Sequence, residues 1–430
     1  MRSRSWLVVA AAMFCCGWGG NQFTPLLIMY RDAAGYSVLT VDAFLGAYVV
    51  GLVPALLTVG ALSDRFGRRP VMMAGTVASL LASGLLALGE TGPVPIFLGR
   101  FVTGVAVAVA MAVGSTWVKE LSDPPHDPDA GPGTGARRAA LALTVGFGLG
   151  AGVAGVLAQW GPWPMVLPYV VHVALTVGVL LVLPRCVETR GPGRAGRLAV
   201  PAVRHPRFRR VVLPMAPWVF GSSGVAYAIM PQVVGDRLGS WGLAYSTLLT
   251  VCTLGAGALV QPIAKRLDRV TDARAVIVSM IAMSTGLALS VVAASVRSPW
   301  LALAAAIVLG SAYGIAVVSG LLEIQRLARP DELAGLTGVY YALAYVGFLL
   351  PAALAVLSKL AGYPVLLSGL VLIALAGTAV IARSSRSHLP GSSLPASSAG
   401  NAGITSVVSN STERSETALG RSPNASRQSR

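Results

Sequence analysis

Residues that could do chemistry are few in this chain, and the densest group lies in one short stretch. The segment Gly60–Pro70 is Gly-Ala-Leu-Ser-Asp-Arg-Phe-Gly-Arg-Arg-Pro, and it joins two long apolar runs. Asp64 and Arg68 are four residues apart, so in a helical turn their side chains share one face and can form an ion pair. The segment therefore predicts a compact, charged turn between two apolar elements.

Three ionisable residues inside or at the edges of apolar runs are candidates for carrying a proton. A carboxyl group in a membrane span is the usual carrier, which singles out Asp42 and Glu323. His172 could shuttle a proton, because an imidazole changes charge near neutral pH. Alternatives stay open: Asp42 and Glu323 as charges at interface level, Glu323 as the partner of Arg326 three residues on, and His172 as a packed, hydrogen-bonded side chain.

Arg100 is a single arginine within an apolar run, Val94–Val118. A charge inside a membrane span costs about 2.5–3.5 kcal/mol on insertion scales, so it needs a reason to be there. Counted from Val94, it lies about 9 Å from the end of its run. It could face a cavity and there bind a substrate or tune a nearby carboxylate, or its guanidinium could reach the headgroups from that depth.

Several protein classes lack their signatures here. The chain shows no nucleophile–base pair, no phosphate-binding glycine loop and no metal-ligand spacing, which disfavours a membrane-embedded enzyme and an ATP-driven pump. Its four cysteines are scattered, so neither a disulfide framework nor a zinc site is expected. We expect no cofactor and no metal.

Composition identifies the elements that must position these residues as membrane helices. Hydrophobic residues make up 54% of the 430 residues and charged residues 12%, with a mean hydropathy of +0.70. Runs of ~20 apolar residues can cross a bilayer. Twelve such runs are predicted: Trp6–Tyr30, Leu39–Leu62, Val71–Gly89, Val94–Val118, Ala139–Trp160, Met165–Pro184, Val211–Val234, Leu243–Ala264, Ala273–Ala294, Trp300–Ile324, Leu333–Leu357 and Gly362–Arg383. The first is expected to be retained rather than cleaved as a signal peptide.

The net charge of +16 is explained by orientation rather than by nucleic-acid binding. Nearly all of the 33 Lys and Arg residues fall on one set of alternate loops, whereas the other set holds only Arg31, Arg237, Arg297 and Lys359. Basic loops face the cytoplasm, so both termini and Gly60–Pro70 are predicted there. Only three basic residues are lysines, which suggests a GC-rich bacterial genome. The predicted location is a bacterial inner membrane.

The chain also repeats itself weakly at a spacing near 200 residues. Gly60-Ala-Leu recurs as Gly257-Ala-Leu, and Gln261 takes the place of Asp64 in the second copy. The predicted organisation is a six-helix half over residues 1–184, a cytoplasmic linker over 185–210, a second six-helix half over 211–383 and a disordered tail over 384–430. The fold class is thus all-α, with twelve transmembrane helices in two pseudo-symmetric halves.

A known family shares the pattern of the charged segment. Gly60, Asp64, Arg65, Gly67, Arg68 and Arg69 match Gly-x-x-x-Asp-Arg-x-Gly-Arg-Arg, so the chain resembles the major facilitator superfamily of transporters. The resemblance implies a cytoplasmic latch: Asp64 meets the start of the eleventh helix, near Leu333, and an arginine reaches Glu120. A loop that only enforces topology is the alternative.

Two further resemblances bear on function. Arg100 with Gly104 is similar to the family's Arg-x-x-x-Gly pattern in helix 4. Gly146, Gly150 and Gly155 resemble the glycine motif of the family's antiporters, although Ala151 stands where proline is usual. These matches imply the drug-efflux branch, but small residues four apart also let helices pack closely without any antiport.

The family's cavity helices would supply a mostly apolar lining with a few polar and aromatic points. The candidate substrate contacts are Asn21, Gln22, Arg100, Trp218, Tyr227 and Tyr313. With few buried charges, such a cavity suits neutral or lipophilic solutes better than sugar phosphates or di-acids. The leading hypothesis is a monomeric secondary transporter that exports small organic molecules by proton exchange within the lipid bilayer. An uptake permease or uniporter of the same fold is the alternative.

Overall fold

The computed structural model describes residues 5–32, 34–131, 133–190, 201–268, 272–329 and 332–386. Over these ranges the chain forms helices and turns and contains no strand. Residues up to Pro390 cluster into one compact unit, which is the part described below. Residues 191–200 of the predicted linker and most of the predicted tail lie outside the described residues, so their character stays a prediction.

The helices follow one another with short connections, as apolar runs separated by polar loops require. They are α1 (Ser5–Asn21), α2 (Leu27–Asp32), α3 (Val38–Phe66), α4 (Arg68–Ala87), α5 (Pro93–Val109), α6 (Ser115–Glu120), α7 (Thr134–Trp160), α8 (Leu167–Val182), α9 (Leu213–Gly224), α10 (Met230–Val233), α11 (Gly242–Leu267), α12 (Arg274–Val296), α13 (Pro299–Leu327), α14 (Leu333–Val346), α15 (Leu350–Leu357) and α16 (Tyr363–Ser385). Short 3₁₀ turns join α1 to α2 and α14 to α15, and single π-helical turns join α5 to α6 and α9 to α10.

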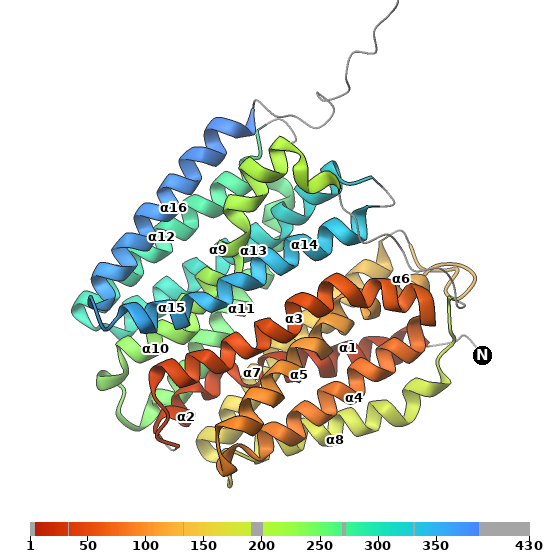
Figure 1. Cartoon of the computed structure of the whole chain (residues 1–430), viewed down its shortest axis with the longest axis horizontal. Coiled ribbons are helices and arrows are strands. Elements are labelled where there is room, and N and C mark those ends of the chain that lie inside the picture. The colour runs from red at the N-terminus through yellow and green to blue at the C-terminus, as the bar shows by residue number, and fades with distance from the viewer. Residues whose placement is uncertain are drawn as a thin grey trace, which may run out of the picture. The chain divides into compact units, whose positions relative to one another are not determined.

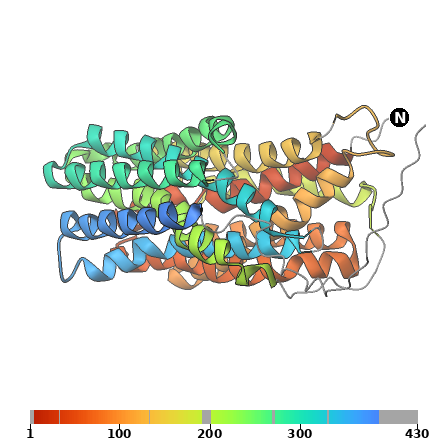
Figure 2. The same cartoon turned by 90° about the horizontal axis from the view of Figure 1, so that it is seen from above.

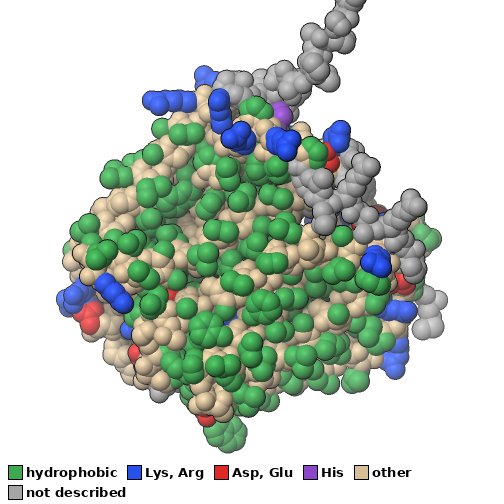
Figure 3. Space-filling model, in the orientation of Figure 1, with side chains coloured by type: hydrophobic (Ala, Val, Ile, Leu, Met, Phe, Trp, Pro, Cys, Tyr) green, Lys and Arg blue, Asp and Glu red, His purple; other side chains and the backbone are tan. Residues whose placement is uncertain are grey.

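Eleven helical segments within the described ranges are long and apolar enough to cross a membrane. They correspond to the second through twelfth runs predicted from the sequence. The first predicted run, Trp6–Tyr30, is broken: α1 ends at Asn21, a single tight turn covers Thr24–Leu26, and α2 follows. Figure 3 shows hydrophobic side chains over the wide middle of one face and Lys and Arg toward its margins, as a belt of lipid-facing surface requires.

The helices gather into two groups, the first half (residues 5–190) and the second half (residues 201–386), as Figures 1 and 2 show. The same pairings recur in both. α3 packs on α5 as α11 packs on α13, and α4 packs on α8 as α12 packs on α16. α1 likewise pairs with α7 as α9 pairs with α14. The predicted fold class, two pseudo-symmetric halves of membrane helices, is confirmed.

Close helix contacts repeat at the spacing seen in the sequence. A Cβ on Gly146 would lie 2.4 Å from the Phe14 carbonyl oxygen, and one on Gly347 would lie 2.1 Å from that of Pro217. Neither position has room for a side chain, so backbones meet directly there. Gly146 and Gly347, 201 residues apart, therefore make equivalent helix–helix contacts in the two halves, whereas Gly60 and Gly257 do not.

The two halves meet along two pairs of helices. α3 lies beside α14 and α15, and α7 lies beside α11. We call the end of the bundle that carries Asp64, Arg68 and Glu120 the arginine-rich end, and the other the arginine-poor end.

Candidate functional site

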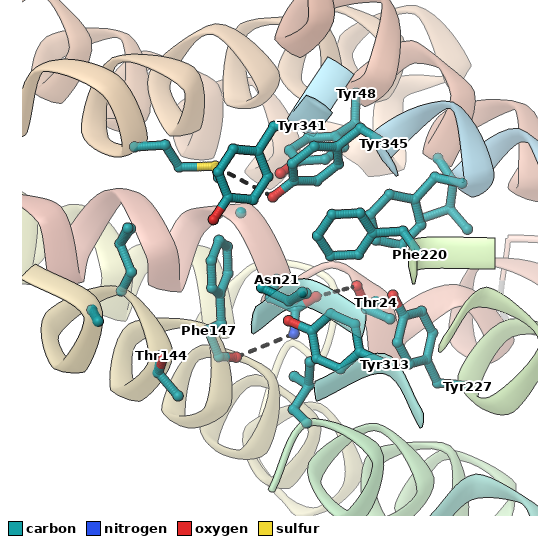
Figure 4. A pocket seen from close by; sticks show the side chains of 18 of the residues that line it. Asn21, Thr24, Tyr48, Thr144, Phe147, Phe220, Tyr227, Tyr313, Tyr341 and Tyr345 are labelled. Atoms are coloured by element: carbon teal, nitrogen blue, oxygen red, sulfur yellow. Dashed lines mark hydrogen bonds between the residues drawn. The ribbon is translucent and has the colours of Figure 1, made fainter. Parts of the chain in front are cut away.

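A cavity of about 200 Å³ lies between the two halves. Figure 4 shows aromatic and polar side chains from several helices around it. Its lining combines residues of the first half, among them Asn21, Thr24, Leu45, Tyr48, Arg100, Met111, Leu143, Thr144 and Phe147, with residues of the second, among them Phe220, Tyr227, Leu254, Gln261, Tyr313, Val317, Leu321, Tyr341, Tyr345 and Phe348. A cavity shared by two pseudo-symmetric halves is where transporters of this architecture bind substrate.

Aromatic rings form one wall of the cavity. Phe220 of α9 stacks on Tyr345 of α14 with ring centroids 4.1 Å apart, and on Phe348 at 5.0 Å. Tyr48 of α3 meets Tyr345 edge-on at 6.0 Å, so rings from both halves join. Such a wall presents flat, polarisable faces to a ligand.

Polar groups are sparse and largely engaged. Asn21 donates from Nδ2 to the Phe147 carbonyl oxygen at 3.2 Å and accepts from Thr24 at 2.8 Å. The Tyr345 hydroxyl donates across the halves to the Met111 sulfur at 3.4 Å. Asn21 is thus held by the break in the first span, because α1 ends there and leaves Thr24 free to turn back.

Arg100 turns inward and does not reach the lipid face. Its side chain is buried, and its Nη1 donates to the Gly20 carbonyl oxygen at 3.3 Å. The guanidinium carbon lies 4.7 Å from the Phe23 ring centroid and 4.6 Å from that of Tyr48. Two aromatic faces therefore flank the cation, an arrangement that is favourable when water is absent.

Two of the predicted cavity residues lie elsewhere. Asn21, Arg100, Tyr227 and Tyr313 line the cavity, but Gln22 and Trp218 are not among its lining residues. Trp218 packs against the hydrophobic core. Gln22 points into the first half, toward Ser83: its N–H still donates to the Trp18 carbonyl oxygen at 2.9 Å, and successive residues of a helical turn face different directions.

Gln22 belongs to a buried chain of hydrogen bonds that includes His172. Its Nε2 donates to Ser83 at 2.8 Å, and Ser83 lies 2.8 Å from His172 Nδ1. His172 Nε2 lies 2.8 Å from the Cys15 carbonyl oxygen, which can only accept, so Nε2 carries the hydrogen and Nδ1 accepts from Ser83. One uncharged tautomer satisfies both ring nitrogens. His172 is therefore placed as a packed, hydrogen-bonded side chain, away from the cavity.

Glu323 is likewise not among the residues that line the cavity. It pairs with Arg207, whose Nε and Nη2 reach its two carboxylate oxygens at 2.5 and 2.9 Å, and both side chains are fully buried. Arg326 adds a second ion pair at 2.8 Å and also contacts Asp268. Both cations hold Glu323 near the end of α13. The spacing of residues in the sequence indicated Arg326 but not Arg207, because Arg207 lies 116 residues away from Glu323.

Asp42 differs from the other two candidates. Its side chain is fully buried, and neither carboxylate oxygen has a hydrogen-bond partner. It lies near the arginine-poor end of α3, where it interacts electrostatically with Arg31 and lies near Gln232 of α10 and Tyr363 of α16. Asp42 thus sits between the halves rather than inside one of them.

The charged segment at the arginine-rich end forms a connected cluster. Arg68 pairs with Asp64 at 3.0 Å and with Glu120 at 2.9 Å. Gly67 ends α3 and precedes α4 with φ of 100°, a conformation that favours glycine. Arg69 donates to the carbonyl oxygens of Pro184 and Cys186, whereas Arg65 lies over the Phe66 ring at the surface.

The segment Cys186–Arg190, which follows α8, also belongs to this cluster. Residue spacing in the sequence did not indicate it. The Glu188 carboxylate accepts from the backbone N–H groups of Arg68 at 2.9 Å and Arg69 at 2.8 Å, the first two residues of α4. Thr189 donates to Glu120, and Arg190 pairs with Asp64 at 3.4 Å. In the sequence, the one feature that could have indicated this contact is the position of Glu188, four residues after the predicted run Met165–Pro184.

Replacing Glu188 with glutamine should destabilise the first half by about 0.5–2 kcal/mol, because a neutral amide is a weaker cap for the N–H groups at the start of α4. Thermal unfolding of the purified protein in detergent measures the loss. Glu90, an exposed acid in a loop, provides the matched control Glu90→Gln, which should leave the unfolding temperature unchanged. Equal shifts in both variants would contradict the capping role.

The halves are closed against each other at the arginine-poor end. Gln159 of α7 donates to the Ser240 carbonyl oxygen and accepts from the Ala244 N–H. A Cβ on Gly155 would lie 1.9 Å from Thr247 Oγ1, so α7 and α11 touch there. Toward the arginine-rich end, the cavity lining extends to Ala140 of α7, Gln261 of α11 and Leu321 of α13. Gly146 and Gly150 serve contacts with α1 instead, at Phe14 and Trp18.

Comparison with known protein families identifies the family to which this chain belongs. The family description "Major Facilitator Superfamily" matches residues 7–352, which is most of the chain. The chain belongs to the major facilitator superfamily. Its members are transporters, so this chain is a multi-pass membrane transporter, as the cavity between two pseudo-symmetric halves implies.

Among superfamily members, two curated relatives match over a limited stretch. A chloramphenicol resistance protein of Pseudomonas aeruginosa is 34% identical over 97 residues, 23% of each chain. The multidrug transporter MdfA of Edwardsiella ictaluri is 32% identical over 103 residues, 24% of this chain and 25% of that one. The matched stretch spans about a quarter of these relatives.

Solved superfamily structures share the fold over nearly the whole chain. The D-xylose-proton symporter superposes with a TM-score of 0.66 at 16% identity, covering 90% of this chain and 97% of that one. The nucleoside transporter NupG gives 0.66 at 14% identity, covering 88% and 99%. At such identities the likeness concerns the fold alone.

Proposed function

We propose that this transporter exports small aromatic organic molecules by alternating access, in exchange for protons. The observation that carries the proposal is the aromatic cavity between the halves, closed at the arginine-poor end by Gln159 and by the contact of Gly155 with Thr247. On the orientation predicted from the basic loops, this conformation offers the cavity to the cytoplasm. Partial likeness to a chloramphenicol resistance protein and a multidrug transporter supports export.

Geometry favours Asp42 as the proton carrier over the other two candidates. Glu323 is held by two arginines, and both nitrogens of His172 are satisfied by one tautomer. Asp42 is fully buried and neither carboxylate oxygen has a hydrogen-bond partner of good geometry, so an ionised carboxylate would be costly there even with Arg31 nearby. Opening of the arginine-poor end would expose Asp42 to water on the outer side, where it would take up the proton that the return step carries inward for release toward the cytoplasm.

The cluster of Asp64, Arg68 and Glu120 is proposed to act as the latch at the arginine-rich end. Within the described ranges, the ion-pair partners of Asp64 are Arg68 and Arg190, both outside the second half. When the arginine-rich end closes, Asp64 would exchange Arg190 for the start of α14, whose N–H groups attract a carboxylate. The segment Cys186–Arg190 would then hold the latch open in the present conformation.

Export by proton exchange predicts that substrate accumulates in vesicles under only one direction of the pH gradient. Purified protein in vesicles should accumulate radiolabelled chloramphenicol when the lumen is acidic, because protons leaving the lumen drive the substrate inward. One pH unit supplies about 1.4 kcal/mol, or roughly tenfold accumulation at a one-to-one ratio. Scintillation counting of filtered vesicles measures it, with protein-free vesicles as the control.

The opposite gradient separates the alternatives. Accumulation only with an alkaline lumen would indicate uptake with protons, and equilibration without accumulation would indicate a uniporter. No uptake above protein-free vesicles under either gradient would remove chloramphenicol from the proposed substrates.

A further inference from the structure

The positive charge in the cavity has no acidic partner. Arg100 is 1% exposed, its Nε has no hydrogen-bond partner, and its Nη1 makes one long hydrogen bond to the Gly20 carbonyl oxygen at 3.3 Å. Among the described residues that line the cavity, it is the one charged side chain. A buried cation without a counter-charge is costly, and a guanidinium offers five N–H groups of which most remain available.

The surroundings restrict what could supply the counter-charge. Phe23 and Tyr48 lie against the guanidinium, at 4.7 and 4.6 Å from ring centroid to Cζ. Nε is buried and has no partner, and the side chain lines the cavity, so a hydrogen-bond acceptor in the cavity would meet an N–H edge of the guanidinium. A planar carboxylate fits such an edge with two parallel hydrogen bonds.

The remainder of the cavity suits an aromatic body of limited size. Its volume of about 200 Å³ is somewhat larger than the engineered apolar cavity of about 150 Å³ that holds benzene in another protein. Phe220, Tyr345 and Phe348 stack along one wall. One substituted ring therefore fills the space.

We infer that aromatic monoanions are the preferred substrates over neutral aromatic molecules, with the carboxylate bound at Arg100 and the ring against the wall formed by Phe220, Tyr345 and Phe348. This inference rests on the proposed function, because it names the substrate of the same cavity. A second negative charge would find no cation among the described lining residues, so di-acids are excluded. A cationic ligand would be repelled by Arg100 at short range.

Three probes of matched size separate charge from shape: phenylacetate, phenylacetamide and 2-phenylethylamine. Isothermal titration calorimetry of the purified transporter near neutral pH, with no gradient, should show phenylacetate binding at least ~10-fold tighter than the amide, as expected for a charge-assisted hydrogen bond. The amine should bind most weakly. In Arg100→Gln the preference for the anion should disappear, while the affinity for phenylacetamide stays close to that of the wild type.

Two further variants keep the test decisive. Arg297→Gln removes an exposed arginine outside the cavity and should leave all three affinities unchanged. Arg100→Lys retains the charge without the planar edge, and should keep part of the preference even if Arg100→Gln fails to fold. Equal binding of anion and amide by the wild type, an anion preference that survives in Arg100→Gln, or no binding of any probe would overturn the inference.

The binding measurement is independent of the vesicle experiment. Loss of the anion preference would leave proton-driven export standing. A transporter that ignores the pH gradient but discriminates the anion would leave the substrate class standing.

Discussion

Replacing Asp42 with asparagine should abolish accumulation driven by a pH gradient while preserving exchange of labelled for unlabelled substrate. Asparagine keeps the shape of a protonated carboxyl group but cannot release a proton. Asp42 is fully buried with both carboxylate oxygens unpartnered, so the variant should fold and close at the arginine-poor end. The roughly tenfold accumulation expected from one pH unit should fall to none.

Vesicles preloaded with unlabelled substrate measure the exchange directly. The control is Asp32→Asn, which changes an exposed acid at the same end of the bundle. It should leave both accumulation and exchange at the wild-type level. Gradient-driven accumulation that persists in Asp42→Asn would remove Asp42 as the carrier, and loss of exchange as well would show that the residue acts on the conformational change itself.

The second large effect concerns stability rather than transport. Glu323→Ala should destabilise the protein by about 3–5 kcal/mol, because it leaves the fully buried Arg207 without its carboxylate. Arg326 would lose one of its two acidic partners in the same step. Unfolding of the purified protein by heat or by a denaturing detergent measures the loss.

An exposed pair provides the comparison. Arg297 and Asp236 form an ion pair at 2.8 Å with side chains 61% and 48% exposed, so Asp236→Asn should change stability by less than about 1 kcal/mol. A double variant that also replaces Arg207 should lose less than the sum of the single losses, because both single variants remove the same Arg207–Glu323 interaction. A loss in Glu323→Ala no larger than in Asp236→Asn would show that the buried pair is solvated.

Local patterns in the sequence predict much of this fold. Apolar runs locate the membrane helices because lipid admits only helices whose backbone groups are satisfied internally. The repeat near 200 residues corresponds to real backbone contacts at Gly146 and Gly347. Asp64 and Arg68 pair as their spacing predicts.

Other parts of the site depend on contacts that no spacing rule contains. Gln22 and Asn21 are neighbours in sequence, yet only Asn21 lines the cavity, because successive residues of the helical turn face different directions and Gln22 is bonded to Ser83 within the first half. Glu188 reaches the start of α4 from 120 residues away. Gln261 takes the place of Asp64 in the repeat but lines the cavity, so equivalent positions in the two halves serve different purposes.

The break in the first span has a consequence for turnover. Gly20, in the last turn of α1, gives its carbonyl oxygen to Arg100, and the carboxyl end of a helix carries about half a negative elementary charge. The guanidinium therefore rests against a weak, permanent counterion when no substrate is present. A full carboxylate of the protein at that position would neutralise Arg100, so Arg100 would then contribute little to the binding of an anionic ligand. If aromatic anions are the substrates, as inferred above, a partial charge would stabilise Arg100 during the substrate-free return step and still leave it able to bind an incoming anion.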